Sequence, residues 1–255
     1  MPANDYFTHS RYIGCIEQIA ERHGITLEVG GDFDNFRRLR ESQPDRPPIS
    51  PIFDSAVSDL HNGNAFWIKG TADDGELVHL QAVRLQQLGD LSLAEHLHGD
   101  RLAYAPPGVE VDPDRSCFSA AQASRQITGK VCYHGELWLK GGPGGFRGHG
   151  LTCALPRLAL ALAYMAWSPD FMFGLVHPLA ACKGLAAREG YMHLEPRGVL
   201  WQHPDASEVF EEWLVWMSRM DLEYLLQVTP MALYEQLEGK RKGSATLSTR
   251  TQVAA

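Results

Sequence analysis

The segment KVCYHGELWLKGGPGGFRGHGLT (residues 130–152) joins a strand pattern to a glycine-rich loop. Residues 130–140 predict a strand, residues 141–150 a loop, and the apolar residues 151–167 a helix. Such a loop between a strand and a helix directs several backbone N–H groups toward one point at the positive end of a helix dipole. The segment therefore predicts a pyrophosphate-binding loop, with Arg147 as a cation beside the phosphates.

The loop differs from the two common nucleotide-binding loops. It lacks the Gly-Lys-Ser/Thr ending of a Walker loop. It also lacks a Gly-x-Gly-x-x-Gly placed at the start of a repeated βαβ unit. A flexible surface loop remains an alternative, as does a nucleotide enzyme, although the sequence has no magnesium-site motif to support the latter.

The end of the loop resembles the acyl-coenzyme A signature of the GNAT N-acetyltransferase superfamily. That signature is Arg/Gln-x-x-Gly-x-Gly/Ala, preceded by an aromatic residue and, a few positions earlier, by a proline. Arg147, Gly150, Phe146 and Pro143 match it. Thr152 departs from the final Gly/Ala, and the spacing from proline to arginine is one residue longer than usual.

A second resemblance lies at Gly190-Tyr191, where a helix ends on glycine and an aromatic residue and the chain enters a strand. Many members of the family carry a tyrosine four residues before that glycine, which protonates the departing thiolate. Ala186 occupies this position here, so the acid is unassigned. Tyr191 and Cys182 are the candidate replacements, and a packed core side chain is the alternative for each.

The resemblance implies an α+β fold with a GNAT-like central mixed, splayed β-sheet flanked by helices. An added N-terminal helix, an insertion at residues 89–129 and a C-terminal helix would complete it. It implies an enzyme that moves an acyl group, most simply acetyl, from acyl-coenzyme A to a primary amine by direct attack. A catalytically inactive acyl-coenzyme A-binding or regulatory protein of the same fold is the alternative. The residues expected to bind the co-substrate are Leu137, Leu139, Gly141, Arg147, Gly148, His149, Gly150, Leu151 and Thr152.

Candidate proton-transfer residues lie on the strand before the loop. Strand alternation places His134, Glu136 and Trp138 on one face. Glu136 is the first candidate for the base and His134 the second. A salt-bridged or solvated strand residue is the alternative for Glu136. His177, at the end of the next predicted strand, is expected to cap a helix or to contact pantetheine or substrate.

The remaining pattern predicts an alternation of helices and strands. Helices are expected at 8–22, 32–41, 51–60, 178–189 and 206–227, and strands at 25–29, 65–69, 77–85, 171–176, 191–194 and 199–203. Residues 89–129 form a long insertion or lid in this prediction, because structureless loops of that length are uncommon unless they have a function.

Composition predicts a folded protein, since 44% of the 255 residues are hydrophobic and 21% charged. We expect one GNAT-like domain over residues 1–238, with its core at 25–203, and a disordered tail at 239–255. The five cysteines are scattered without Cys-x-x-Cys, so neither a disulfide framework nor a metal site is expected. With no signal-peptide pattern and no long apolar segment, we expect a cytoplasmic protein without a membrane span.

The net charge of the sequence indicates which class of partner the protein can bind. The net charge is −8, and residues 1–238 alone carry 19 basic and 31 acidic residues, a net charge of −12. An acidic body disfavours nucleic acid and favours a cationic small-molecule amine. A homodimer is one of two possibilities, because the stripe of Trp213 and Trp216 on the predicted helix 206–227 fits either core packing or a dimer face.

Overall fold

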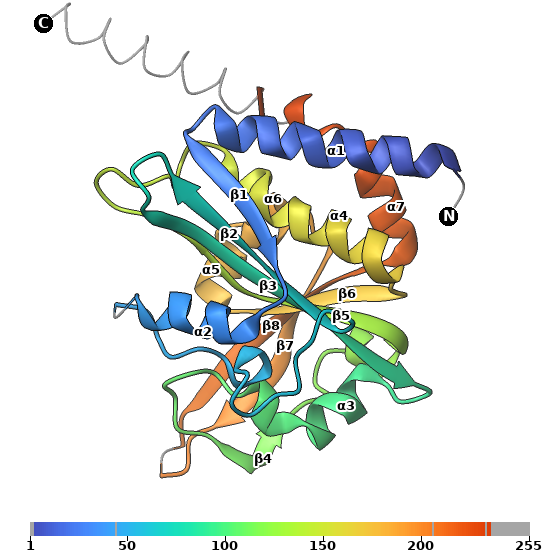
Figure 1. Ribbon diagram of the computed structural model, residues 1–255. Coiled ribbons are helices and arrows are strands. Elements are labelled where there is room, and N and C mark those ends of the chain that lie inside the picture. The colour runs from blue at the N-terminus through green and yellow to red at the C-terminus, as the bar shows by residue number, and fades with distance from the viewer. Residues whose placement is uncertain (1–2, 44, 206, 233, 236–255) are drawn as a thin grey trace, which may run out of the picture.

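The computed structural model describes residues 3–235 except residues 44, 206 and 233. Its centre is one mixed sheet of eight strands in the order β1-β2-β3-β5-β6-β8-β7-β4, with helices on both faces (Figure 1). The expected α+β class is therefore confirmed. The strands are β1 (Ile25–Gly30), β2 (Ala65–Ala72), β3 (Leu77–Gly89), β4 (Asp112–Cys117), β5 (Gly129–Leu139), β6 (Phe171–Val176), β7 (His193–Gln202) and β8 (Val209–Ser218).

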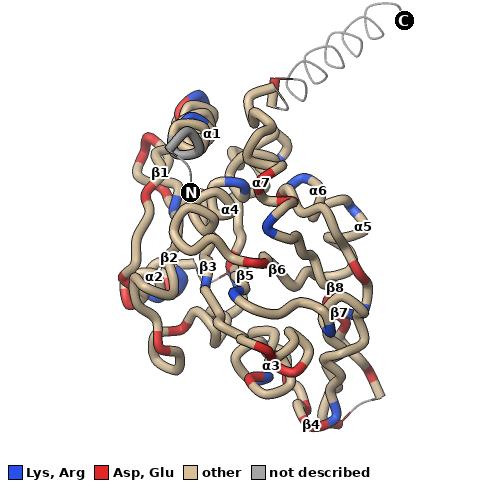
Figure 2. The backbone as a smooth tube through the Cα atoms, turned by 90° about the vertical axis from the view of Figure 1, so that its right-hand side faces the viewer, with Lys and Arg blue, Asp and Glu red and all other residues tan. Residues whose placement is uncertain are grey.

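Two groups of helices bury the two faces of this sheet. On one face, α1 (Ala3–Glu21), α4 (Leu155–Trp167) and α7 (Arg219–Gln227) enclose a core that includes Ile16 and Leu158. On the other face, α2 (Phe33–Glu41) and α3 (Leu93–Gly99) cover a second core around Phe36 and Trp201. The view turned by 90° shows the same separation, with acidic and basic positions interspersed along the chain (Figure 2). Burial on both faces explains why the central strands are apolar runs.

The parallel pair β5 and β6 separates after a short contact. Their pairing covers only Val131–Tyr133 and Phe171–Phe173. Beyond it, β5 continues to Leu139 and β6 to Val176 without pairing to each other. The sheet therefore opens between residues 134–139 and 174–176, which confirms the expected splay.

A bulge in β5 lies within this opening. Glu136 has a φ of 54°, and the register with β3 shifts between the pairs Leu80–Trp138 and Ala82–Gly135. A bulge places two successive residues on one face of a strand. Because Glu136 turns toward the α2 side and His134 does not, the prediction that His134, Glu136 and Trp138 share one face is wrong. Trp138 lies on the Glu136 side, where the Arg46 guanidinium is 5.2 Å from its ring.

The Glu136 carboxylate is buried, with 3% of its side chain exposed, and it is surrounded by donors. Arg40 Nε donates to Oε2, and the Ser50 N–H and Oγ donate to Oε1 at 2.8 and 2.7 Å. Arg46 Nη2 lies 3.5 Å from Oε2. A buried carboxylate needs such partners, because its desolvation is otherwise unfavourable. This cluster ties α2 and the following loop to the bulge.

The predicted helix 206–227 is wrong. Residues 209–218 form β8, which pairs with β6 on one side and β7 on the other. Its apolar run suits a strand buried between two neighbours, and Trp213 and Trp216 belong to the sheet. The helix α7 begins at Arg219, directly after its N-cap Ser218, which forms a capping box with Asp221 in the first turn. The two strands expected at 191–194 and 199–203 are one strand, β7, with an irregularity between Glu195 and Val199.

Three further predicted helices are shorter or divided in the structure. The helix expected at 51–60 is only the turn Pro51–Phe53. The helix expected at 178–189 is two short helices, α5 (Pro178–Cys182) and α6 (Leu185–Glu189), separated where Gly184 adopts a φ of 73°. Residues 151–153 form a 3₁₀ turn, and α4 starts at Leu155. The strand expected at 171–176 is present with these ends, and the other predicted helices and strands are present with shifted ends.

The insertion 89–129 is folded into the body of the protein. It contains α3, the turns Arg101–Tyr104 and Ala123–Arg125, and β4, which pairs with β7 at the edge of the sheet. Its residues Leu93 and Phe118 are buried in the second core. Of the two interpretations, a long insertion or a lid, the structure agrees with the insertion. The tail expected at 239–255 lies outside the described residues.

We predict that Arg40→Met lowers the free energy of unfolding by about 3 kcal/mol, because it leaves the Glu136 carboxylate buried without its main partner. Urea unfolding measures the change. Arg38→Met is the matched control, since Arg38 lies on the same helix but is exposed. Equal stability of the two variants would contradict the assigned role of the ion pair.

Candidate functional site

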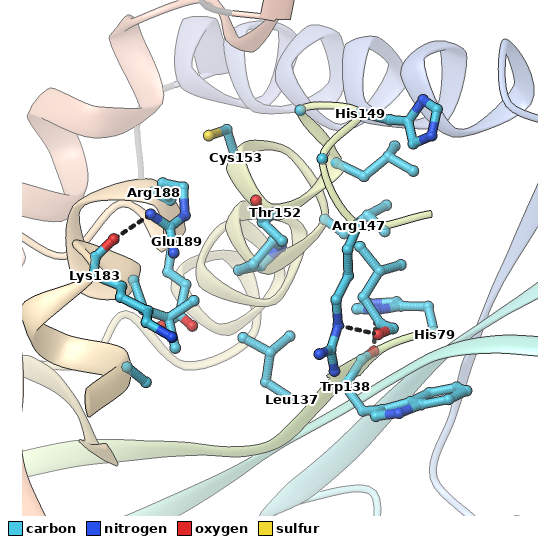
Figure 3. Close-up of a pocket in the computed structure, with 18 residues that line it drawn as sticks. His79, Leu137, Trp138, Arg147, His149, Thr152, Cys153, Lys183, Arg188 and Glu189 are labelled. Carbon is cyan, nitrogen blue, oxygen red and sulfur yellow. Dashed lines mark hydrogen bonds between the residues drawn. The ribbon is translucent and has the colours of Figure 1, made fainter. Parts of the chain in front are cut away.

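A cavity of about 800 Å³ lies where β5 ends, between the glycine-rich loop and the helices α5 and α6 (Figure 3). Eight of the nine residues predicted to bind the co-substrate line it, which are Leu137, Leu139, Arg147, Gly148, His149, Gly150, Leu151 and Thr152. Gly141 does not. A Cβ added at Gly141 would be 2.8 Å from Arg147 Cδ, so this glycine allows the Arg147 side chain to pack against it.

Backbone amides of the loop are available to a ligand. Gly148 and Gly150 have φ values of 89° and 79°, a conformation that favours glycine. Within the described chain, the N–H groups of Gly148, Gly150 and Leu151 donate to no other protein atom. A Cβ added at Gly148 would meet no protein atom within 4 Å. The loop therefore forms an open nest of donors, the arrangement that binds phosphate groups.

Cationic side chains face this cavity from two walls. Arg147 Nε donates to the Leu139 carbonyl at 2.8 Å, which fixes the guanidinium beside the end of β5. Lys183 and Arg188 come from the opposite wall, where Arg188 Nη1 donates to the Lys183 carbonyl (Figure 3). The sequence analysis missed Lys183 and Arg188. The only signal for them was their place on the helix that ends at Gly190.

His79 contributes a neutral imidazole to the same cavity. Its Nδ1 is 2.8 Å from the Trp138 carbonyl and therefore carries the hydrogen. Burial lowers the pKa of His79 to about 4. Its Nε2 is buried and has no hydrogen-bond partner within the described residues. This lone pair can accept a hydrogen bond from an amide that lies along β5.

A second cavity of about 310 Å³ lies across the opening in the sheet. It is lined by β5, β6, β8 and the segment after α2, and both predicted catalytic residues, His134 and Glu136, belong to it. The residues that line both cavities are Leu137, Ala180, Leu185 and Glu189. The two cavities therefore meet at the gap between β5 and β6. For convenience we call them the loop cavity and the far cavity.

His134 is a neutral group of the far cavity with a hydrogen-bond partner at each ring nitrogen. Its Nε2 is 3.0 Å from Gln81 Oε1, and its Nδ1 is 3.3 Å from the Tyr191 hydroxyl. Burial and the nearby His79 lower the pKa of His134 to about 3. Burial also raises the pKa of Tyr191 well above its usual value. Both rings therefore stay uncharged at neutral pH.

Two buried carboxyl groups escaped the sequence analysis. Glu212 of β8 lines the far cavity and accepts a hydrogen bond from Trp201 Nε1 at 2.8 Å, and burial raises its pKa to about 7. Glu189 of α6 lines both cavities, and burial raises its pKa to about 8. The wrong assignment of β8 as helix hid Glu212, and no motif marks Glu189.

The other residues singled out from the sequence have separate places. Cys182 is exposed and lines neither cavity, whereas Tyr191 lines the far cavity. The Nδ1 of His177 accepts a hydrogen bond from the Leu179 N–H at 3.2 Å, so this residue caps α5 while also lining the far cavity.

Among the described residues, no group of three or more His, Cys, Asp or Glu side chains could hold a metal ion. None of the described helices is long and apolar enough to cross a membrane.

Comparisons with known proteins give similar structures only. No family model matches the chain, and no curated protein matches it either. A solved chimera of the Vibrio cholerae spermidine N-acetyltransferase and hSSAT has 9% identity and a TM-score of 0.44, covering 79% of this chain and 99% of that one. An aminoglycoside acetyltransferase, AAC(6')-Ib, solved with coenzyme A and kanamycin, has 13% identity and a TM-score of 0.42, covering 78% of this chain and 98% of that one.

A third similar structure is TofI, solved with an inhibitor and MTA, at 12% identity and a TM-score of 0.36, covering 81% of this chain and 98% of that one. The chain combines a mixed sheet, a splayed parallel pair of strands and an amide-rich loop beside the opening. The fold is thus the α+β fold with a splayed central sheet that the loop motif predicts.

Proposed function

We propose that this protein is an acyl-coenzyme A-dependent N-acyltransferase that acylates a primary amine on a small molecule. The observation that carries the proposal is the pair of cavities that meet through the sheet. One begins at the nest of loop amides, the other opens on the far side, and both reach Leu137 and Glu189. Transfer between two substrates needs such an arrangement, because each must approach the reacting atoms from its own side.

The loop cavity fits the co-substrate. The amides of Gly148, Gly150 and Leu151 would hold its pyrophosphate, and Arg147 and Lys183 would neutralise charge beside it. Residues 137–139 of β5 are not paired with β6 and can accept the extended pantetheine arm as an added strand. When bound, acyl-coenzyme A supplies the activated thioester. An acetyl group is the simplest acyl chain for this proposal.

The far cavity fits a compact acceptor. Its volume of about 310 Å³ is at the small end of ligand cavities. The buried carboxyl group of Glu212 lines it and provides a position for an ammonium group. Pro107 is the residue of the described insertion that reaches this cavity, so the insertion shapes the acceptor site at one point.

The sequence analysis names Glu136 and His134 as candidates for the base. The structure favours other roles for both residues. Every oxygen of the Glu136 carboxylate already accepts hydrogen bonds from Arg40 or Ser50, so we propose that it positions β5. The neutral His134 is held by Gln81 and Tyr191, and we propose that it orients the acceptor. An inactive binding protein remains the second candidate, because Ala186 stands where many members carry the acidic tyrosine.

We predict that Gly148→Ala weakens acetyl-coenzyme A binding by about tenfold or more, a loss of about 1.4 kcal/mol, because the new Cβ enters the loop cavity. Isothermal titration calorimetry measures the affinity. Gly142→Ala is the matched control, since Gly142 has a similar φ of 78°, has equal free space and does not line the cavity. Equal affinities in the two folded variants would refute the loop as the pyrophosphate site.

We also predict that small primary amines, presented as a panel with acetyl-coenzyme A, release free thiol in steady state. Lysine-containing peptides should react slowly, because the far cavity is small and partly enclosed by the segment after α2. Binding of acetyl-coenzyme A without thiol release for any amine would favour the inactive alternative. Preference for peptide lysines would contradict the small acceptor.

A further inference from the structure

One titratable group stands where the two cavities meet. Of the four residues that line both cavities, Leu137, Ala180 and Leu185 are aliphatic, and Glu189 carries a carboxyl group. Its side chain extends from α6 toward β5, on the wall opposite Arg147 (Figure 3). Glu189 therefore borders both cavities at the point where they meet.

We propose that Glu189 is the catalytic proton carrier, which takes a proton from the attacking amine and delivers it to the departing thiolate. This inference rests on the proposed function. In the step, the neutral amine nitrogen forms a bond to the acyl carbon, the carbon–sulfur bond breaks, and its electron pair leaves with sulfur. The excess proton on nitrogen passes to the Glu189 carboxylate and then to sulfur. The products are the amide and the free thiol, with Glu189 restored.

The surroundings of Glu189 suit this role. The residue is 3% exposed, yet within the described chain no group donates a hydrogen bond to its carboxylate. Arg188, its neighbour on α6, favours the charged form, but burial dominates and raises the pKa of Glu189 to about 8. A carboxyl group with a pKa near the working pH can both accept and return a proton.

The other titratable groups nearby are less suited. The Glu136 carboxylate is saturated by donors, and burial keeps His134 and Tyr191 neutral. Glu212 lines the far cavity alone, so it cannot reach a thiolate in the loop cavity. The charged and titratable groups on elements around Glu189 are Arg188 on α6, Lys183 after α5, Arg157 on α4, Cys153 before α4, His134 on β5, Tyr191 before β7 and Glu212 on β8.

The decisive experiment compares the full chain with Glu189→Gln, which preserves shape and removes the ionisation. The probes are acetyl-coenzyme A and hydroxylamine, a nucleophile that is small and uncharged above neutral pH. Loss of thioester absorbance gives the rate as a function of pH. We expect the wild-type rate to rise with pH through an ionisation near 8. The variant should be slower by about 10²-fold or more and should lack that ionisation, with unchanged affinity for acetyl-coenzyme A.

Glu212→Gln is the matched comparison, because it removes another buried carboxyl group with a raised pKa. This variant should keep the ionisation near pH 8, even where its KM changes. If Glu189→Gln retains both the rate and the pH dependence while binding acetyl-coenzyme A, the proton-carrier role is overturned and the proposed function stands. If the wild type binds acetyl-coenzyme A but does not accelerate the reaction, the role is also overturned. If the wild type does not bind acetyl-coenzyme A, the proposed function itself fails.

Thermal unfolding checks the ionisation without any substrate. Because the folded-state pKa of Glu189 is raised, this group favours folding below its unfolded-state pKa, and that contribution is lost as the pH rises through about 8. Glu189→Gln should therefore have a higher Tm than the wild type at pH 9 and a similar Tm at pH 5. An equal Tm at both pH values would contradict the buried ionisation. If the glutamine variant does not fold, Glu189→Asp takes its place and should retain the ionisation with a reduced rate.

Discussion

The buried ion pair between Arg40 and Glu136 is the contact on which the rest of the site depends. It holds a bulge in β5 at Glu136, within the segment 134–139 that is not paired with β6. A parallel pair of strands normally continues its hydrogen bonds along the shared length, because unpaired backbone groups are unfavourable when buried. Here the bulge redirects β5, and the pairing with β6 ends after three residues. The cost of burying two charges is offset by the hydrogen bonds of Ser50 and of the proline carbonyls that Arg40 contacts.

The opening in the sheet determines the chemistry that the site can perform. It connects the cavity of the loop amides to a smaller cavity on the other face, and the walls at their meeting point are aliphatic apart from Glu189. Such an environment disfavours charge, which is why the pKa of Glu189 is raised and that of His134 is lowered. A reaction that moves a proton between two substrates is favoured by a carboxyl group whose pKa is near the working pH, because such a group is present in both its protonated and its ionised form.

Much of the fold and of the lining of the loop cavity could be predicted from the sequence. The strand and loop of residues 130–152 carry their own local signals, namely alternation and glycines at positions of positive φ, and eight of nine predicted residues line the loop cavity. The residue that we propose for proton transfer and the place of Glu136 could not be predicted in the same way. Strand alternation fails at the Glu136 bulge, which depends on Arg40, about a hundred residues earlier in the chain. Glu189 carries no motif, because its importance comes from where two cavities meet. The β8 strand was mistaken for a helix because its apolar run, residues 213–217, does not alternate with polar residues.

The central claim is that the opening between β5 and β6 receives the thioester end of acyl-coenzyme A. A crystal structure of the chain with coenzyme A tests this most directly. The account predicts the pyrophosphate on the amides of Gly148, Gly150 and Leu151, the pantetheine arm along residues 137–139, and the sulfur beside Leu137 and Glu189. Coenzyme A bound elsewhere, or bound with its sulfur directed away from the gap between β5 and β6, would contradict it.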